Sequence, residues 1–476
     1  MQWIPIVLII ALLSSVSSVS SAQEAQIVVV SDKLTLGLPG DEFGTSIAGS
    51  GGSVVIGAPG YNGSTSTGDP AASSGYAAVF EANPTGVGYT WATSLYSAYP
   101  VSYDQFGSSV AMGTWNGLSG NPRPEALAAV PQDDTTIQYP NAGQVSIHRV
   151  NDSTGLWQLR QQLEATPPLG QSYFGSSMEL DGDRLVVGAY GYGSNSGAVW
   201  VFKRYAQPCS LCWIVDSLSS GDPIPYPDPA PSAGARFGAG VDIADACGRI
   251  AVAAPDIDNR RGAVYAYKYD LLGNNTWDPE QVLTSPSPSP GYGQRFGGGG
   301  GPYLSGGVSL TCDYLAVSDT LGANKVWVYR TADYAVEAGL GPGLPSVSFT
   351  YGASIDLSGE RLVVGDPNRP PTGSGSLGAV EYYQRVGVGD WVLVATFIPP
   401  DNLGSIDFGR EVKILDGNIL WIGAPDRGHT GPGEAYFVNL DEWTLATPVP
   451  LLAPVGYAAL LALLAASGIG FAIKRM

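Results

Sequence analysis

The chain has 476 residues, of which 44% are hydrophobic and only 14% are charged, against about a quarter charged in ordinary globular domains. Hydrophobic residues recur along the whole length, which excludes a disordered protein, and the 64 glycines and 36 prolines are typical of a turn-rich all-β protein. The net charge of −19 gives a surface that repels phosphate groups, so nucleic acid is excluded as a partner.

Residues 1–22 have the features of a secretory signal peptide. An apolar run, WIPIVLIIALL, is followed by Ser20, Ser21 and Ala22, which are small residues of the kind that a signal peptidase reads. No lysine or arginine precedes the run, a departure from the usual pattern, but the run is too short to span a membrane comfortably. We therefore expect an exported protein.

A repeat follows this leader. An aromatic residue followed by glycine marks seven starts in phase, at steps of 55 to 68 residues: Phe43, Phe106, Phe174, Phe237, Phe296, Tyr351 and Phe408. Each pair precedes a hydrophobic strand that ends in small residues: VVIGAP (54–59), LAAVP (127–131), LVVGAY (185–190), IAVAAP (250–255), LAVSD (315–319), LVVGDP (362–367) and LWIGAP (420–425). Such periodic self-similarity is typical of a repeat architecture.

Two more strands complete each unit. The third usually begins with glycine, as in GAVWVFKR (197–204), and the fourth often carries a tryptophan, as in WVLVATFIP (391–398). Alternation of apolar and polar residues in these strands fits sheets with two unlike faces. Four short strands in each of seven units predict an all-β fold, a seven-bladed β-propeller of four-stranded antiparallel blades over residues 23–440.

The propeller explains the composition of the repeat. We expect glycine and alanine to line the central hub, where the blades converge, and the aromatic residues to wedge between neighbouring blades. The segment 27–36 precedes the first aromatic-glycine pair, where a blade's outer strand would lie. We expect it to complete the seventh blade beside residues 433–438 and so close the ring. The alternative is a frayed amino-terminal arm.

The repeated FG and GAP sequences resemble the FG-GAP repeats of integrin α-subunit head propellers and their bacterial relatives, over about residues 26–440. The fifth unit, which ends in VSD, and the sixth, which opens with Tyr351, depart from the pattern. The resemblance implies a propeller that binds other molecules, and in many members a calcium ion in an Asp-rich loop.

The calcium loop is absent here. The turns at its place, such as LDGDRL (180–185) and LDGNIL (415–420), offer one or two acids each, too few to surround a cation. Asp181, Asp183 and Asp416 are therefore interpreted as turn residues, and we predict no cofactor and no metal ligand.

No catalytic constellation is visible. Only two histidines occur: His148, on a predicted strand and expected to pack, and His429, in a loop. We also find no acidic cluster at a repeated position of the units. No catalytic residue is predicted, and the chain is interpreted as a non-enzyme.

Four cysteines suit an oxidising compartment. Cys209 and Cys212 could close a small loop, and Cys247 and Cys312 occupy the same place in adjacent units, so that they could bridge blades four and five. Three pairings are open, and a redox-active pair at 209 and 212 is the alternative to structural disulfides.

The best candidates for ligand binding lie in the loops after the GAP strands, which in a propeller emerge on one face. Their aromatic, amide and charged side chains suit sugars or peptides. The candidate residues are Tyr61, Asn62, Asp133, Asp134, Tyr190, Tyr192, Asp256, Asp258, Arg260, Arg261, Asp426 and His429.

The carboxyl-terminal end predicts attachment to a membrane. After a linker at 441–450, residues 451–473 are uncharged and long enough to cross a bilayer, and the basic tail 474–476 would face the cytoplasm. The segment also resembles the IPTL and PEP sorting signals of exported bacterial proteins, which a membrane protease would process. A plain single-span anchor is the alternative.

These features favour an extracellular, membrane-tethered propeller that binds a protein or a glycan, for instance in adhesion. A structural protein of the cell envelope, in which the ring is a spacer, and a propeller hydrolase or lyase are the alternatives.

Overall fold

The computed structural model describes residues 26–30, 32–64, 70–84, 88–116, 122–132, 139–205, 212–216, 223–224, 233–270, 276–287, 295–298, 307–321, 323–343, 350–369, 378–400, 407–426 and 431–443. The compact unit Glu24–Asp441 contains all the strands. Within the described residues, helical structure is confined to α2 (Tyr192–Asn195), α3 (Ile257–Arg260) and the 3-10 turns η1 (Asp245–Cys247) and η2 (Leu440–Trp443). This unit is therefore all-β, as the composition predicts.

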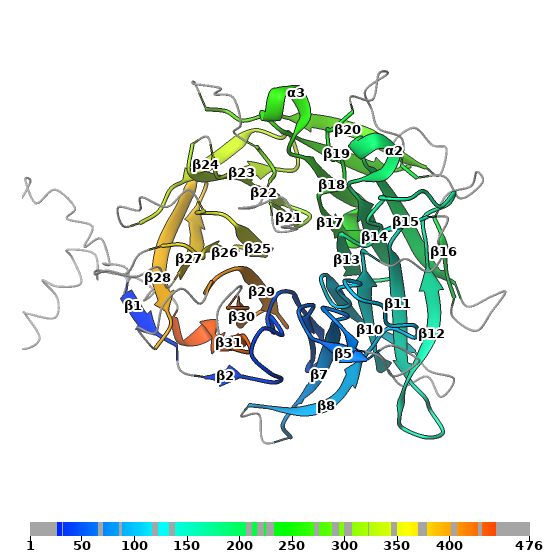
Figure 1. Ribbon diagram of the computed structural model, residues 1–476. Coiled ribbons are helices and arrows are strands. Elements are labelled where there is room, and N and C mark those ends of the chain that lie inside the picture. The colour runs from blue at the N-terminus through cyan, green and yellow to red at the C-terminus, as the bar shows by residue number, and fades with distance from the viewer. Residues whose placement is uncertain are drawn as a thin grey trace, which may run out of the picture. The chain divides into compact units, whose positions relative to one another are not determined.

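Seven sheets surround a common centre in this unit (Figure 1), and each contains a blade of four antiparallel strands. In blades 1 to 6 the four strands follow one another in sequence order. Blades 1 to 3 consist of β3 (Ile47–Ser50), β4 (Ser53–Ala58), β7 (Tyr76–Ala82), β8 (Tyr89–Leu95); β9 (Val110–Asn116), β10 (Pro122–Val130), β11 (Gln144–Val150), β12 (Trp157–Leu163); and β13 (Ser177–Asp181), β14 (Arg184–Ala189), β15 (Ala198–Tyr205), β16 (Cys212–Val215). A two-stranded hairpin, β5 (Gly63–Ser64) and β6 (Pro70–Ala71), extends the connection between β4 and β7.

The remaining four blades repeat this pattern. They consist of β17 (Gly240–Ala244), β18 (Arg249–Ala254), β19 (Ala263–Tyr269), β20 (Trp277–Leu283); β21 (Val308–Leu310), β22 (Tyr314–Asp319), β23 (Lys325–Arg330), β24 (Val336–Leu340); β25 (Ser354–Ser358), β26 (Arg361–Asp366), β27 (Ala379–Gly387), β28 (Asp390–Ile398); and β29 (Glu411–Leu415), β30 (Ile419–Ala424), β31 (Glu434–Asn439). Blade 7 takes its fourth strand from the other end of the chain.

The amino-terminal segment closes the ring, as predicted. Strand β2 (Lys33–Leu34) pairs antiparallel with β31, with Lys33 opposite Tyr436. The Lys33 ammonium also lies 2.5 Å from the Glu434 carboxylate. The preceding strand β1 (Gln26–Val29) is a feature that the sequence did not predict: it adds a fifth, parallel strand to β28 of blade 6. The start of the ring is therefore tied to its last two blades.

The seven aromatic residues of the aromatic-glycine pairs are fully buried, and each that belongs to a described core cluster lies between two blades. Phe43 packs with Ile56 and Phe80 of blade 1 and with Trp421 of blade 7. Phe174 likewise contacts residues of blades 2 and 3. The predicted wedges are confirmed, and burial of these rings supplies much of the hydrophobic free energy that joins the blades.

The sixth unit has Tyr351 where the other six units have phenylalanine, and the structure shows the reason. This ring takes the place of phenylalanine between blades 5 and 6, and its hydroxyl lies 2.9 Å from that of Tyr383. Tyr383 donates a hydrogen bond of 2.7 Å to Glu381, which is paired with Arg369. Tyrosine is required here because a buried polar network needs a partner at this point.

The glycine of GAP is not a hub residue, contrary to our expectation. A β-carbon at Gly57 of β4 would overlap the carbonyl oxygen of Gly107, in the aromatic-glycine turn of the next blade. Gly107 itself has a φ of 87°, which side chains rarely adopt. These glycines are needed where the second strand of one blade touches the turn that enters the next blade.

The predicted signal peptide (1–22) and the predicted span (451–473) lie outside the described residues. Among the residues that are described, no helix is long and apolar enough to cross a bilayer.

Candidate functional site

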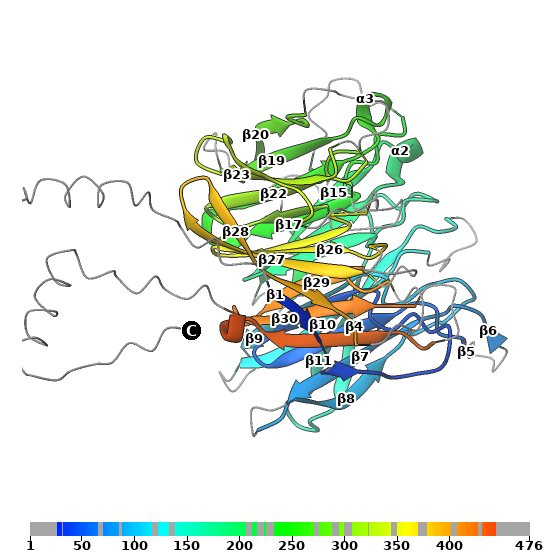
Figure 2. The ribbon, with the colours of Figure 1, turned by 90° about the vertical axis from the view of Figure 1, so that its left-hand side faces the viewer.

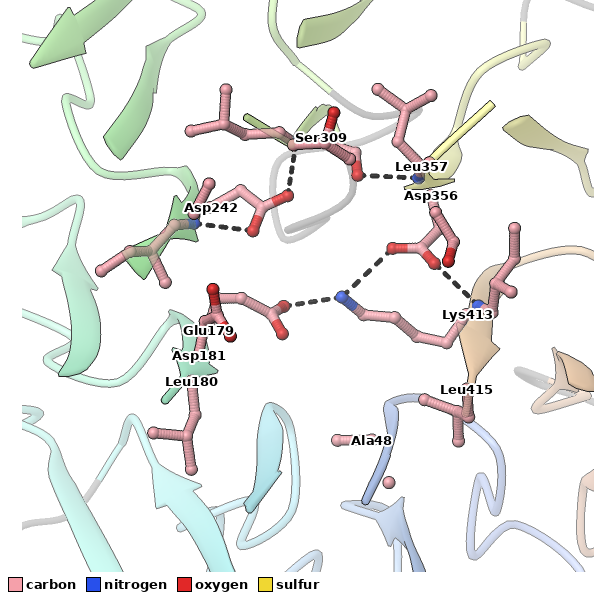
Figure 3. Close-up of a pocket in the computed structure, with 18 of the residues that line it drawn as sticks. Ala48, Glu179, Leu180, Asp181, Asp242, Ser309, Asp356, Leu357, Lys413 and Leu415 are labelled. Atoms are coloured by element: carbon pink, nitrogen blue, oxygen red, sulfur yellow. Dashed lines mark hydrogen bonds and ion pairs between the residues drawn. The ribbon is translucent and has the colours of Figure 1, made fainter. Parts of the chain in front are cut away.

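One residue of each innermost strand, at an equivalent position of the seven blades, marks the hub of the propeller. Equivalent register in the seven sheets identifies Ala48, Ala111, Glu179, Asp242, Ser309, Asp356 and Lys413. In six blades this residue comes five positions after the aromatic residue of its unit. Figure 3 shows Glu179, Asp242 and Lys413 pointing from their strands into one central space.

Two of our expectations about the hub are wrong. Only blades 1 and 2 place a small apolar residue at this position, so the hub is not lined by glycine and alanine throughout. Three acids also occupy a repeated position, contrary to the prediction that no such cluster exists. Counting five residues from each aromatic-glycine pair would have revealed them. The blades converge here with enough space for long side chains, whereas close backbone contact occurs farther out, at the GAP glycines.

The polar residues of the hub link each blade to the next. Asp242 accepts a hydrogen bond of 2.6 Å from the backbone N–H of Leu310 in blade 5. Ser309 accepts one of 2.9 Å from Leu357 in blade 6. Asp356 accepts one of 2.7 Å from the N–H of Ile414 in blade 7. Each donor directly follows the hub residue of its own strand, so one pattern repeats across three interfaces.

Lys413 closes the centre of this network. Its ammonium donates to Glu179 on blade 3 across the hub, at 2.6 Å, and lies 3.4 Å from Asp356 on the adjacent blade (Figure 3). The side chains of Lys413 and Glu179 are 20% and 25% exposed, and that of Asp356 only 9%. The ion pair therefore crosses the axis at partial burial, where the attraction is screened less than at an open surface.

A cavity of about 380 Å³ lies on one side of this ion pair. Its lining extends toward the carboxyl ends of the innermost strands, at Asp181, Thr311, Ser358 and Asp416. A second space of about 30 Å³ lies toward the amino ends and includes Glu411. The first and second strands of a blade are antiparallel, so the GAP loop, which follows the second strand, lies beside the amino end of the first strand. The larger cavity lies at the other end, where the hairpin joins the first strand to the second.

Burial changes the protonation of the hub carboxyls. It raises the pKa of Asp242 to about 8, with a further contribution from Glu179. It raises the pKa of Asp356 to about 6 and that of Glu411 to about 8. Burial acts to lower the pKa of Lys413, but nearby carboxylates outweigh it and raise that pKa well above its usual value. The hub can therefore hold and exchange protons near neutral pH.

The loops after the GAP strands emerge on one side of the ring, as expected. Figure 2 shows β5, β6, α2 and α3, which all belong to these connections, on the same side. We call this side the loop face. It is the side opposite to the larger cavity, so the two candidate sites are distinct.

Blade 1 brings a group of tyrosines to the loop face. Tyr61 makes ring contacts with Tyr76 at 5.1 Å and with Tyr96 at 6.1 Å between centroids. Tyr96 belongs to the connection between β8 and β9 and is 49% exposed. Tyr99 and Tyr103, in the same connection, are 66% and 61% exposed. The four exposed or half-buried residues, Tyr61, Tyr96, Tyr99 and Tyr103, form what we call the tyrosine patch. Sequence reasoning found only Tyr61, because it considered only the GAP loops.

The predicted binding residues of blade 3 mostly support the fold. Tyr190 is only 7% exposed and stacks on Tyr173 with centroids 5.0 Å apart. Tyr192, in α2, packs edge-on against Trp200. Arg236 lies over the Tyr190 ring, 5.5 Å from its centroid. These aromatic groups are engaged within the protein.

The charged candidates of blade 4 divide into two kinds. Asp256 forms ion pairs with Arg236 at 3.3 Å and with Arg295 at 3.1 Å. Asp258, Arg260 and Arg261 are exposed on or beside α3. Asp258 and Arg261 form a pair at 3.1 Å. Only these three exposed residues are accessible to a partner.

Among the remaining candidates, Asn62 is exposed and accepts a hydrogen bond of 2.9 Å from the N–H of Ser73. Asp426 is half-buried and accepts one of 2.7 Å from the N–H of Gly431. The predicted residues Asp133, Asp134 and His429 lie outside the described residues.

The residues assigned to turns and packing behave accordingly. Asp416 accepts hydrogen bonds of 3.2 Å from Gly51 and Gly52, in a turn of blade 1. Asp181 accepts one of 2.8 Å from Asp245. Within the described part of the chain, no three Asp, Glu, His or Cys side chains are grouped to hold a metal ion. His148 is buried in β11, and burial lowers its pKa to about 4.

The cysteines form disulfides. Cys247 and Cys312 are bonded, which confirms the predicted bridge between blades 4 and 5. Cys212 is disulfide-bonded too, whereas Cys209 lies outside the described residues.

Comparison with known proteins agrees with the repeat. The FG-GAP repeat family model matches residues 157–202, from the outer strand of blade 2 into the third strand of blade 3. The crystal structure of Saccharomyces cerevisiae Sqt1 matches over 86% of this chain and 99% of that chain, with a TM-score of 0.44 and 10% identity. No curated protein matches the chain. The chain is therefore a seven-bladed β-propeller that contains an FG-GAP repeat at residues 157–202 and whose blades are joined through aromatic-glycine turns.

Proposed function

We propose that this propeller is a binding protein whose loop face recognises a glycan or a protein through the tyrosine patch. The observation that carries the proposal is the exposure of Tyr99 and Tyr103, at 66% and 61%, beside Tyr61 and Tyr96 on a rigid blade. Exposed aromatic rings are costly in water and are typical of recognition surfaces, where they supply large contact area at a low entropic cost.

The loop connection that carries these rings is held in place. The N–H of Tyr103 donates a hydrogen bond of 2.7 Å to the carbonyl of Ala72, and the N–H of Val101 donates one of 2.6 Å to Asp104. A rigid loop loses little conformational freedom when it binds, which favours affinity. The patch is therefore suited to recognition rather than being a set of unrelated exposed residues.

The test is binding of the full-length protein to a glycan array and to surface proteins of intact cells. The double variant Tyr99→Ala/Tyr103→Ala should weaken the strongest interaction about tenfold or more. The matched control is Trp91→Ala, which removes an exposed aromatic residue from outer strand β8 and should leave binding unchanged. Equal loss in both variants, or no interaction with any glycan or surface protein, would favour a structural role instead.

We further propose that the protein acts outside the cytoplasmic membrane, with residues 1–22 removed on export and residues 451–473 serving as an anchor or as a sorting signal. The support is the sequence pattern described above and the disulfides, which suit an oxidising compartment. The intact mass of the mature protein tests both ends. Retention of residues 1–22 would contradict export, and loss of the tail would favour processing by a sorting protease.

A further inference from the structure

The larger cavity at the hub combines apolar and acidic lining residues. Ala48, Met112, Leu180 and Leu415, from blades 1, 2, 3 and 7, contribute apolar surface, and Ile243, Leu310 and Leu357 contribute more on blades 4 to 6. On the side of blades 3 to 6, Glu179, Asp242 and Asp356 line it together with Ser309 (Figure 3). Its volume of about 380 Å³ is within the range of small-molecule sites, which also combine an apolar surface with a few convergent polar groups.

The charge of the lining is strongly unequal. Among the described residues that line the cavity, five carry carboxyl groups, Glu179, Asp181, Asp242, Asp356 and Asp416, and one is basic, Lys413. Lys413 pairs with two of them. The remaining negative charge in a space with low-dielectric walls attracts a cation.

The cavity also offers hydrogen-bond acceptors that the protein does not use. Glu179 accepts from Lys413 with one oxygen, Oε2, while Oε1 makes no hydrogen bond with any described residue. The Glu179 side chain is 25% exposed and lines both this cavity and the smaller space on the other side of the ion pair. An ammonium group in the cavity could donate to this oxygen while its hydrocarbon part lies against Leu180 and Leu415.

From this combination we infer that the hub cavity is a binding site for a small organic ammonium ion, a primary amine attached to an apolar body. The acidic residues of the lining accept hydrogen bonds from the ammonium and balance its charge. The apolar residues between them exclude water from the body of the ligand, which favours an amine over a hydrated metal ion. This site is separate from the tyrosine patch and does not depend on the function proposed for the loop face.

Binding should release protons. Asp242, whose pKa burial raises to about 8, is mostly protonated at pH 7, and an ammonium ion beside it would favour the carboxylate. The other titratable groups that face this region are Glu179, Asp356, Glu411 and Lys413, together with Asp181 and Asp416 in the cavity lining. Heat of binding that depends on the ionisation enthalpy of the buffer is therefore an additional readout.

The experiment is isothermal titration calorimetry of the full-length protein with 2-phenylethylammonium. The neutral analogue 2-phenylethanol and the anion 3-phenylpropionate serve as ligand controls. We expect the amine to bind about tenfold or more tightly than either, which corresponds to about 1.4 kcal/mol, with release of protons at pH 7. Asp242→Asn should weaken amine binding about tenfold. Asp258→Asn, which removes an exposed acid from α3, should not change it.

A second variant is needed in case Asp242→Asn does not fold. Ala48→Leu would place apolar atoms in the cavity and should weaken the amine and the alcohol alike, while circular dichroism reports an unchanged fold. The inference is overturned if the alcohol binds as tightly as the amine. It is also overturned if no binding occurs at millimolar amine, or if correctly folded Asp242→Asn and Ala48→Leu both keep wild-type affinity.

Discussion

The hub of this propeller has an alanine side and a charged side, built on the same backbone. Ala48 and Ala111 occupy, in the innermost strands of blades 1 and 2, the register position that Glu179, Asp242 and Lys413 occupy in blades 3, 4 and 7. Strand register and aromatic wedges are equivalent on both sides. The repeat therefore specifies the contacts between blades but leaves the axial position free to vary, and that position determines what the centre of the ring can bind.

The largest effect is expected from removing the positive charge of the charged side. Lys413→Met would leave Glu179 and Asp356 without their cation and should lower the free energy of unfolding by about 3–5 kcal/mol at pH 8. The loss should be smaller at pH 5, where the raised pKa of Asp356 allows it to be protonated. Denaturant unfolding at both pH values measures this.

The control for this charge removal is Lys203→Met, in strand β15 of blade 3. Its ammonium lies 5.7 Å from the ring centroid of Tyr205, away from the hub lining. It should change stability by no more than about 0.5 kcal/mol. Equal losses in the two variants would mean that the central ion pair has no special role.

A second substitution tests where small residues are needed. Gly57→Ala would place a methyl group on the carbonyl of Gly107, and the overlap should cost about 3 kcal/mol. Gly387→Ala is the matched control, because the nearest atom to its added carbon is 3.9 Å away. Unfolding by urea distinguishes them. A tolerated Gly57→Ala would show that the glycines are not required for contact between blades.

The two sides of the hub should also differ in how they affect stability as the pH changes, because only the charged side has a titratable group such as Asp242 at this position. The pKa of Asp242 in the folded protein, about 8, exceeds its ordinary value of 3.8, so the folded state binds the proton more tightly. Its contribution to the free energy of unfolding must therefore fall as pH rises from about 4 to about 8 and level off above that.

Asp242→Asn should remove this dependence. The variant loses one acceptor, which costs about 1 kcal/mol at pH 5. Relative to the wild type it should gain about 4 kcal/mol between pH 5 and pH 8.5, so that it is more stable by about 3 kcal/mol at the higher pH. Thermal or denaturant unfolding at several pH values provides the comparison. Parallel stability curves for the two proteins would show that Asp242 titrates normally.

The smallest change in stability is expected at the interface between blades 5 and 6, where the buried aromatic residue is Tyr351 instead of phenylalanine. Tyr351→Phe removes the hydrogen bond to Tyr383 and should cost about 1 kcal/mol, since Tyr383 keeps Glu381 as its acceptor. Phe237→Tyr, at the equivalent place between blades 3 and 4, adds a hydroxyl to a fully buried ring and should cost at least as much. A stabilised Phe237→Tyr would contradict the account of why tyrosine is confined to blade 6.

The sequence was sufficient to predict the ring because its evidence is repeated. Aromatic-glycine pairs such as Phe43 and Phe174 recur in phase, and the phase of residues 27–36 predicted the closing strand β2. The bridge between Cys247 and Cys312 followed from their equivalent positions in adjacent units. Each of these features depends on local pattern or on position within a repeat.

The hub residues could be located by their place in the repeat, but their pairing could not be predicted, because it depends on residues that meet only when the ring closes. Glu179 and Lys413 each lie five positions after an aromatic residue of the repeat, yet they are 234 positions apart in the chain and no local pattern relates them. Ser309 is displaced further by the longer connection that precedes β21. Likewise, the tyrosine patch combines two different connections of blade 1, of which sequence reasoning considered only one.

The central claim is that burial in the charged half of the hub holds carboxyl groups partly protonated near neutral pH. Carbon-13 NMR of aspartate carboxyls in the intact protein, with signals assigned through Asp242→Asn and Asp356→Asn, measures it most directly. We predict midpoints of about 8 for Asp242 and about 6 for Asp356. Titration of both groups near 4, the range of exposed aspartates, would contradict the account.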